Sequence, residues 1–116
     1  FKIALFTSSA SLGAGTTAYS TSNEISNTSG SAYSAGGATL TSVTPTTDGT
    51  TAICDFSDVS FTSASFTANG ALIYNDSQSD KAVAVIAFGG DKTVSSGTFT
   101  IQFPTADATN AIIRLA

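Results

Sequence analysis

The sequence predicts an all-β protein, and the pattern of its second half carries that prediction. Between Asn69 and Ala116 four apolar runs are separated by turn-forming residues, and the run at Thr98–Phe103 alternates strictly between polar and apolar side chains. Alternation with a period of two, cut by turns at short intervals, is typical of antiparallel strands. We therefore expect an antiparallel β-sandwich of about eight strands, with a jelly roll as a candidate topology.

The predicted strands follow one another from the start of the sequence to its end. They span residues 1–7, 36–43, 50–56, 59–61, 65–74, 82–88, 98–103 and 111–115. Turn signals at Asn75–Ser77 and Gly89–Asp91 and the proline at Pro104 separate the last four strands. Thr44–Pro45 ends the second strand, and the Asp48–Gly49 pair between two apolar runs predicts a hairpin.

The spacing of Thr21 and Glu24 matches a capping box, which predicts one helical turn over residues 22–27 and no longer helix anywhere. The predicted core is made of large apolar side chains on the strands, where the phenylalanines supply most of the buried area. It contains Ile3, Leu5, Leu40, Val43, Ile53, Phe56, Phe61, Phe66, Leu72, Tyr74, Val83, Val85, Phe88, Phe99, Ile101, Phe103, Ile112 and Leu115.

One long segment, Ser8–Ala35, interrupts the strand pattern after the first strand. It is rich in Ser, Thr, Gly and Ala, and its large apolar anchors are Leu12, Tyr19, Ile25 and Tyr33. A loop of this length is uncommon inside a compact domain and usually has a function of its own. Since no repeat or linker divides the chain, residues 1–116 are expected to form a single domain. We also expect a further segment before Phe1, because the sequence has no Met.

The composition is apolar and poor in charge, with 41% hydrophobic and 10% charged residues. Ser and Thr make up roughly a third of the chain, well above ordinary usage. A hydroxyl-covered surface loses its water at less cost than a charged one, which suits packing against neighbouring proteins. The high β propensity of Thr explains the same composition equally well, and both interpretations remain open.

The net charge is −4, and the basic residues Lys2, Lys81, Lys92 and Arg114 are scattered along the chain. No basic patch follows a phosphate backbone, so nucleic-acid binding is not expected. No apolar run is long enough to cross a membrane, and a signal peptide is not expected. Cys54 is the single cysteine, so no internal disulfide forms, which fits assembly in a reducing cytoplasm.

The residue types needed for common catalysis are missing or dispersed. There is no His, hence no His-based nucleophile activation and no ordinary zinc site with the single Cys. The eight carboxylates stand mostly at turns; they are Glu24, Asp48, Asp55, Asp58, Asp76, Asp80, Asp91 and Asp107. We predict no catalytic, cofactor-binding or metal-binding residue, and no enzymatic activity.

Three local patterns resemble binding sites for calcium, phosphate or aromatic stacking, and each has a simpler explanation. Asn75–Asp80 offers several oxygens for calcium but lacks the glycine and terminal Glu of an EF-hand loop. Gly89–Lys92 lacks the full phosphate-loop pattern and is better explained as a turn. Phe99, Ile101 and Phe103 could form a stacking platform, but no basic residue stands near them, so they are expected in the core.

Several short motifs resemble a family of small tailed-bacteriophage virion proteins. They are Gly70–Asn75, Phe88–Lys92 and Ser96–Ile101, together with Asn23–Ser26 followed by Tyr33–Ala38, which is similar to the family's "NEV…GY.AGG" region. The resemblance implies a capsid cement or decoration protein that stabilises capsomers on the outer surface of the virion. Its partners would be the major capsid protein and copies of itself, with no nucleic acid and no membrane.

A fibre or appendage head domain that binds a receptor or glycan is the alternative function. The Ser8–Ala35 loop would supply that surface, with Tyr19 and Tyr33 as amphipathic contacts. In either case we expect contacts through strand edges and this loop rather than through salt bridges, because few charges are present and exposed ion pairs contribute little.

Overall fold

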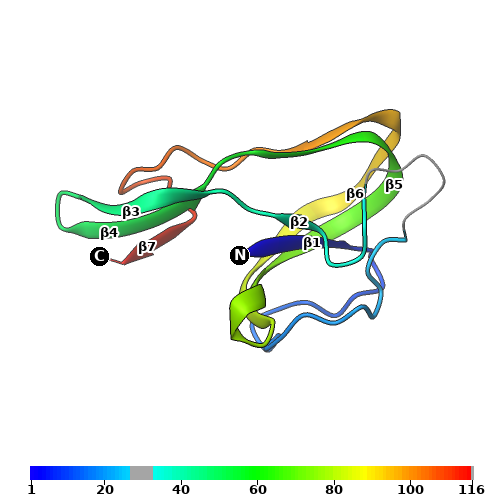
Figure 1. Cartoon of the computed structure of the whole chain (residues 1–116), viewed down its shortest axis with the longest axis horizontal. Coiled ribbons are helices and arrows are strands. Elements are labelled where there is room, and N and C mark those ends of the chain that lie inside the picture. The colour runs from blue at the N-terminus through cyan, green and yellow to red at the C-terminus, as the bar shows by residue number, and fades with distance from the viewer. Residues whose placement is uncertain (27–32, 116) are drawn as a thin grey trace. The chain divides into compact units, whose positions relative to one another are not determined.

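In the computed structural model, residues 1–26 and 33–115 are described, and in this part the chain is all-β with antiparallel sheets (Figure 1). The elements in chain order are β1 (Lys2–Phe6), β2 (Ala38–Thr39), β3 (Ser42–Asp48), β4 (Thr51–Phe56), β5 (Val59–Asn75), the 3₁₀ turn η1 (Asp76–Gln78), β6 (Lys81–Ile101) and β7 (Ile113–Leu115). The all-β prediction is confirmed. The sequence predicted eight strands, and the described residues contain seven.

The chain forms two compact units, which we describe separately. Unit 1 comprises Phe1–Thr39 and Phe61–Phe99, and unit 2 comprises Leu40–Ser60 and Thr100–Ala116. The expectation of a single domain over residues 1–116 stays a prediction.

Unit 1 is built on a sheet with the strand order β2-β1-β5-β6. β1 lies between β2 and β5 and is antiparallel to both, with Lys2 opposite Thr39 on one side and opposite Tyr74 on the other. β5 and β6 are joined through η1 and lie side by side as one long ribbon (Figure 1). β1 and the end of β5 are the most buried parts of this sheet.

Unit 2 holds a smaller sheet with the order β3-β4-β7. The predicted hairpin at Asp48–Gly49 is confirmed, because β3 pairs with β4 up to Asp48 and Thr51 and Gly49 has a φ of 62°. Pro45 was predicted to end a strand, but β3 continues through it. The β3–β4 register shifts between Val43 and Thr46 at this point, and an edge strand tolerates a proline at such an irregularity.

Two predicted chain breaks in the second half are wrong. The strands expected at 59–61 and 65–74 are one strand, β5. The strand expected at 82–88 and residues 98–101 of the strand expected at 98–103 both belong to β6, which ends at Ile101. Gly89 and Gly90 have φ values of 78° and 153°, so they form an irregularity within β6 instead of reversing the chain. The long partner β5 supplies backbone pairing on both sides of this irregularity.

The predicted helical turn at residues 22–27 does not form over residues 22–26, and Asn27 lies outside the described residues. Asn23 has a left-handed φ of 62°, and Glu24 makes a β-bridge with Phe6. Glu24 therefore does not cap a helix, because its carboxylate has other partners, described below.

Most of the predicted core is buried or partly buried. Val43 and Val83 are exceptions, with 36% and 39% of their surface exposed, because β3 and β6 are edge strands. Val85, Phe88, Phe99, Phe103 and Ile112 are only half-buried, and the side chain of Leu115 lies outside the described part. The structure adds buried residues that one-faced alternation missed: Ala4, Phe6, Ile25, Tyr33, Ala64, Ala68, Ala71, Ile73 and Ala111.

Candidate functional site

The first part of the long loop, residues 8–26, is fastened to the sheet of unit 1 at both ends. Thr7 N donates to Asn23 O at 2.9 Å and Ile25 N donates to Leu5 O at 3.0 Å, so the end of the loop lies beside β1. Near the middle of the loop, Tyr19 N donates to Asp80 O at 2.9 Å. The predicted long loop is therefore present over residues 8–26 and 33–35, while residues 27–32 lie outside the described part. Its backbone is tied to β1 and to the start of β6.

The only Glu of the chain fixes the loop through its side chain. Tyr19 Oη donates to Glu24 Oε1 at 2.5 Å, and Tyr33 Oη donates to Glu24 Oε2 at 2.5 Å. Gly36 N also donates to Oε2, at 2.8 Å. One carboxylate thus joins two points of the loop to the segment that leads into β2.

The third tyrosine completes this arrangement. Tyr74 on β5 donates its hydroxyl to Gly36 O at 2.6 Å and stacks on Tyr19, with ring centroids 4.6 Å apart. Tyr33 Oη in turn accepts from Leu5 N at 2.9 Å. We call Tyr19, Glu24, Tyr33, Gly36 and Tyr74 the Tyr–Glu network; it contains all three tyrosines of the chain.

The three phenols are held in their protonated form. Burial raises the pKa of each, to about 12 for Tyr74, and the hydrogen bond to Glu24 raises the pKa of Tyr19 and Tyr33 further. Protonated phenols near neutral pH act as donors to the carboxylate and the backbone, not as bases or nucleophiles. The network therefore holds the loop in place.

The predicted glycan contact through Tyr33 is not available at the surface, because Tyr33 is completely buried. Its ring packs against Phe61 and Phe66 at centroid distances of 5.4 and 6.0 Å. Tyr19 is half-buried and stacked on Tyr74. The sequence predicted these tyrosines as anchors of the loop but did not predict their bonds to Glu24. A single Glu in a loop that carries two of the three tyrosines was the pattern that could have indicated these bonds.

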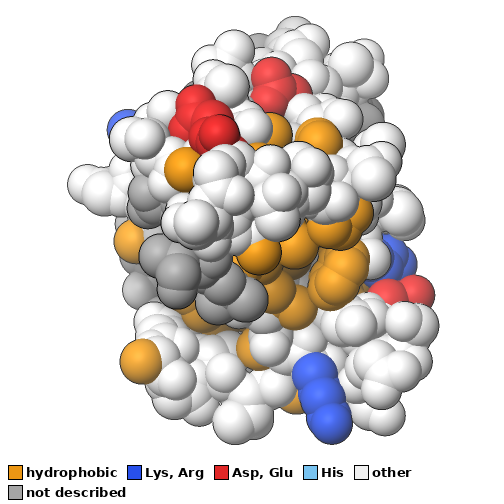
Figure 2. Space-filling view, turned by 90° about the vertical axis from the view of Figure 1, so that its left-hand side faces the viewer, with side chains coloured by type: hydrophobic (Ala, Val, Ile, Leu, Met, Phe, Trp, Pro, Cys, Tyr) orange, Lys and Arg blue, Asp and Glu red, His pale blue; other side chains and the backbone are white. Residues whose placement is uncertain are grey.

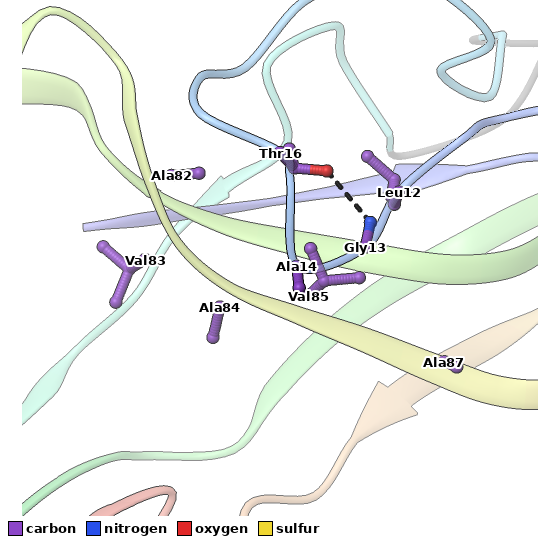
Figure 3. A pocket seen from close by; sticks show the side chains of 9 residues that line it. All are labelled: Leu12, Gly13, Ala14, Thr16, Ala82, Val83, Ala84, Val85 and Ala87. Atoms are coloured by element: carbon purple, nitrogen blue, oxygen red, sulfur yellow. Dashed lines mark hydrogen bonds between the residues drawn. The ribbon is translucent and has the colours of Figure 1, made fainter.

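Pockets lie along the loop within unit 1, including one of about 70 Å³ that is lined by Ala10, Leu12 and Ile86 among others. Two others are larger. The first, of about 440 Å³, lies between the turn at residues 12–16 and β6 (Figure 3). Its lining residues are Leu12, Gly13, Ala14, Thr16, Ala82, Val83, Ala84, Val85 and Ala87. The second, of about 380 Å³, has an apolar floor that includes Phe6 and Leu72 and a rim of hydroxyl and amide groups from Ser11, Thr16, Thr17, Ser20, Ser22 and Asn23. Neither pocket is lined by a charged residue.

The carboxylates predicted to serve turns bind backbone N–H groups at several positions. Asp48 Oδ2 accepts from Ala108 N at 2.8 Å, and Asp58 Oδ1 accepts from Phe103 N at 2.7 Å. Asp107 Oδ1 accepts from the backbone N–H groups of Thr109 and Asn110. These bonds fasten the irregular segment after β6 within unit 2.

Asp55 on β4 is different from the other acids. It is 2% exposed, and its Oδ1 accepts from Phe56 N at 2.8 Å. Its Oδ2 has no hydrogen-bond partner in the described part of the chain. A lone carboxylate supplies too few ligands for a metal ion.

The residues of these three local patterns make the following contacts. In Asn75–Asp80, Asn75 Oδ1 caps η1 by accepting from Ser77 N, and within the described residues no group of three potential metal ligands gathers. At Gly89–Lys92, Asp91 Oδ1 accepts from Asn69 Nδ2 at 3.0 Å, across the β5–β6 ribbon. Ile101 is buried, Phe99 packs against Phe66 and Phe88, and Phe103 packs against Phe56.

On the face shown in Figure 2 charged groups are few and lie among uncharged polar and apolar atoms, with one basic and one acidic group next to each other at the right. Over the described residues, no helix has the length and hydropathy needed to cross a membrane. Comparison with protein-family models, with curated proteins and with solved structures found no match.

Proposed function

We propose that this chain is a structural protein of a tailed-bacteriophage virion, and specifically a capsid cement or decoration protein. It would bind the outer surface of the shell and bridge neighbouring capsomers through the major capsid protein and through copies of itself. It would contact neither nucleic acid nor membrane and would join the particle in the host cytoplasm. The fold that we propose for this protein is a β-sandwich with a jelly-roll-like topology.

The observation that carries the proposal is the preformed loop surface of unit 1. A segment of Ser, Thr, Gly and Ala has few side chains to bury, yet Glu24 and backbone bonds to β1 and β6 hold it against the sheet. Ordering such a segment costs about 1–2 kcal/mol per residue, so a loop ordered before binding loses less entropy on binding. A fastened, uncharged loop suits a protein whose role is contact.

The chemistry of the surface supports the same function. The chain has only four basic residues, and the described acids largely serve backbone N–H groups. Hydroxyl groups can exchange water for a protein neighbour without separating an ion pair from solvent. Apolar and hydroxyl area buried across a seam between capsomers would raise the temperature at which the shell opens.

Particles with and without the protein test this proposal. Particles that lack it should keep their shape and capsid stoichiometry but lose their genome at a lower temperature, and purified protein added back should restore heat resistance. A Glu24→Gln variant, with its loop loosened, should restore it less than an Asp76→Asn control, which changes an exposed carboxylate outside the Tyr–Glu network. Equal heat resistance with and without the protein would contradict the cement role.

The appendage head domain remains a second candidate because of the pocket of about 380 Å³ beneath the loop. Its apolar floor and uncharged hydroxyl and amide rim are the surroundings that a neutral, hydroxylated ligand requires. Copy number separates the two functions, since a cement protein is present in hundreds of copies and an appendage in a dozen or fewer. An electron-microscopy map of the intact particle would measure it.

A further inference from the structure

The outer edge of β6 is paired only at its beginning in the part of the chain that the structure describes. β6 is the last strand of its sheet, and on its outer side Ala82 N donates to Thr17 O at 2.9 Å. Ala18 and Lys81 form a β-bridge next to this bond. Residues 17–19 therefore act as a short neighbouring strand that shows the edge can be extended.

A tight turn prevents the loop from continuing this pairing. Thr16 N donates to Gly13 O at 3.0 Å, and Gly13 N donates to Thr16 Oγ1 at 2.9 Å (Figure 3). Antiparallel pairing of Ala18 with Lys81 would, if continued, place Ala14 opposite Val85. The turn instead directs residues 12–16 away, and the pocket of about 440 Å³ occupies the space between them and β6.

The lining of this pocket shows that it follows the edge of the strand. Successive side chains of a strand point to opposite faces, so a pocket over one face would touch every second residue. This pocket is bordered by the four successive residues Ala82, Val83, Ala84 and Val85, and then by Ala87. Val83, on this edge, is one of the few large apolar side chains that are exposed.

The accessible length of the edge is limited at both ends. Residues 17–19 cover it up to Ala82, and the irregularity at Gly89 and Gly90 ends the regular strand. The stretch between these limits is Val83–Gly89, and its middle residue is Ile86.

We propose that a second copy of this chain binds this edge, with the two β6 strands antiparallel around a two-fold axis at Ile86. The pairing places Val83 opposite Gly89, Ala84 opposite Phe88 and Val85 opposite Ala87. A larger side chain thus meets a smaller one at each pair, and Ile86 meets its own copy. Two-fold pairing is self-complementary by symmetry, and each strand gains backbone hydrogen bonds along the edge.

Charge complementarity favours a second copy as the occupant. The edge has no charged residue from Ala82 to Gly90, so nothing on the paired stretch repels its copy. The flanking charges are Asp80 and Lys81 before it and Asp91 and Lys92 after it. In the two-fold pairing the end that carries Asp80 and Lys81 lies towards the end that carries Asp91 and Lys92. Each end has one acid and one base, so the flanks do not repel each other, and they stay outside the paired stretch because Ala18 already pairs with Lys81.

Disulfide cross-linking tests both the partner and the register. In a Cys54→Ser background, which removes the native thiol, Ile86→Cys places two thiols on the two-fold axis. Directly paired residues have Cα atoms about 4.5–5.5 Å apart, inside the range for a disulfide. Val83→Cys is the control, because its two copies would be about 20 Å apart at about 3.3 Å per residue.

We expect a covalent dimer of the Ile86→Cys protein after mild oxidation, and none of the Val83→Cys protein, on non-reducing gels. The Cys54→Ser parent should show a concentration-dependent dimer in sedimentation experiments. A parent that stays monomeric up to its solubility limit overturns the proposal. Equal cross-linking of both cysteine variants overturns it as well.

A second pair of variants does not depend on cysteine chemistry. Val83→Lys adds a charge to the edge of β6, and Val43→Lys makes the same change at a valine of similar exposure on the edge strand β3. Val83→Lys should weaken the dimer about tenfold or more, whereas Val43→Lys should leave it unchanged. Equal effects of the two variants would contradict pairing through β6. Because all these measurements use the isolated protein, their outcome is separate from that of the capsid proposal.

Discussion

β1 and the first part of β6 have similar sequences and very different environments. Lys2–Phe6 reads KIALF and is buried from Ile3 to Phe6, whereas Ala82–Phe88 reads AVAVIAF and is half-buried or exposed throughout. Both runs are apolar enough for the centre of a sheet. The difference is position, because β1 has a strand on each side and β6 is at the edge.

The loop adds to this difference. Ala10, Leu12 and Tyr19 pack against the buried cluster that contains Ala4 and Phe6 of β1. Glu24 keeps the loop in place. In the described part of the chain the turn at residues 13–16 leaves the outer edge of β6 beyond Ala82 without a paired strand, while the side chain of Val85 packs against the same cluster. The burial of an apolar strand in this protein therefore depends on its position in the sheet and on whether the loop covers it.

The largest expected loss of stability comes from a substitution that disrupts the contact between β1 and the segment leading into β2. Gly37 has a φ of 80°, and a Cβ at this position would lie 1.8 Å from Ile3 O. Gly37→Ala should therefore destabilise the protein by at least about 3 kcal/mol, because a backbone must move. Gly49→Ala is the control: its φ is 62° with nothing within 4 Å, so only the left-handed conformation is penalised, by about 1–2 kcal/mol. Denaturant unfolding of both variants measures the difference, and equal losses would contradict the close approach to β1.

The next largest loss of stability is expected from a substitution that loosens the loop over β1. Glu24→Gln removes the charge and replaces one acceptor oxygen by an amide donor. At least one of the hydrogen bonds that Tyr19 and Tyr33 donate to Glu24 therefore loses its acceptor. We expect a loss of about 2 kcal/mol in unfolding free energy and faster amide exchange in residues 17–25. Asp91→Asn, at an exposed carboxylate, should change stability by less than about 0.5 kcal/mol. A Glu24→Gln protein as stable as this control would show that the network does not hold the loop.

The tyrosines also predict a dependence on pH. The pKa of Tyr74 is raised to about 12 in the folded protein from the ordinary value of 10, and those of Tyr19 and Tyr33 are raised too. Below pH 10 both folded and unfolded states keep the protons, so this stability is complete. Between pH 10 and 12 the unfolded state ionises first, and Tyr74 alone should lower stability by about 1 kcal/mol at pH 11. Tyrosinate absorbance should appear together with unfolding; ionisation near pH 10 in a folded protein would contradict the network.

The smallest expected effect concerns the exposed strand. Val83→Thr keeps the shape of the side chain and changes a position that is 39% exposed, so the stability of the monomer should change by less than about 0.5 kcal/mol. Val43→Thr, at 36% exposure, should behave in the same way. Thermal unfolding at low protein concentration measures both. A loss of 2 kcal/mol at Val83 would mean that β6 is covered like β1.

Local patterns predicted several elements correctly for identifiable reasons. The β1 run, the hairpin at Asp48–Gly49 and the aromatic core around Phe61 and Phe66 depend on neighbouring residues and on side-chain alternation. The breaks placed at residues 62–64 and 89–91 were wrong because the local sequence does not report how long the partner strand is. Tyr33 was predicted to be a loop contact and is buried, since its position depends on Glu24, Leu5 and Phe61 together.

The sequence by itself determined the β class, the presence of a long loop after the first strand, the low charge and the lack of the residues for common catalysis. These properties follow from composition and from patterns over a few residues. The tertiary structure alone decided which apolar run lies at the centre of the sheet, that two tyrosines meet one carboxylate, and that within the described residues the edge of β6 is unpaired past Ala82. Each of these depends on contacts between segments far apart in the chain, and a local pattern carries no information about such partners.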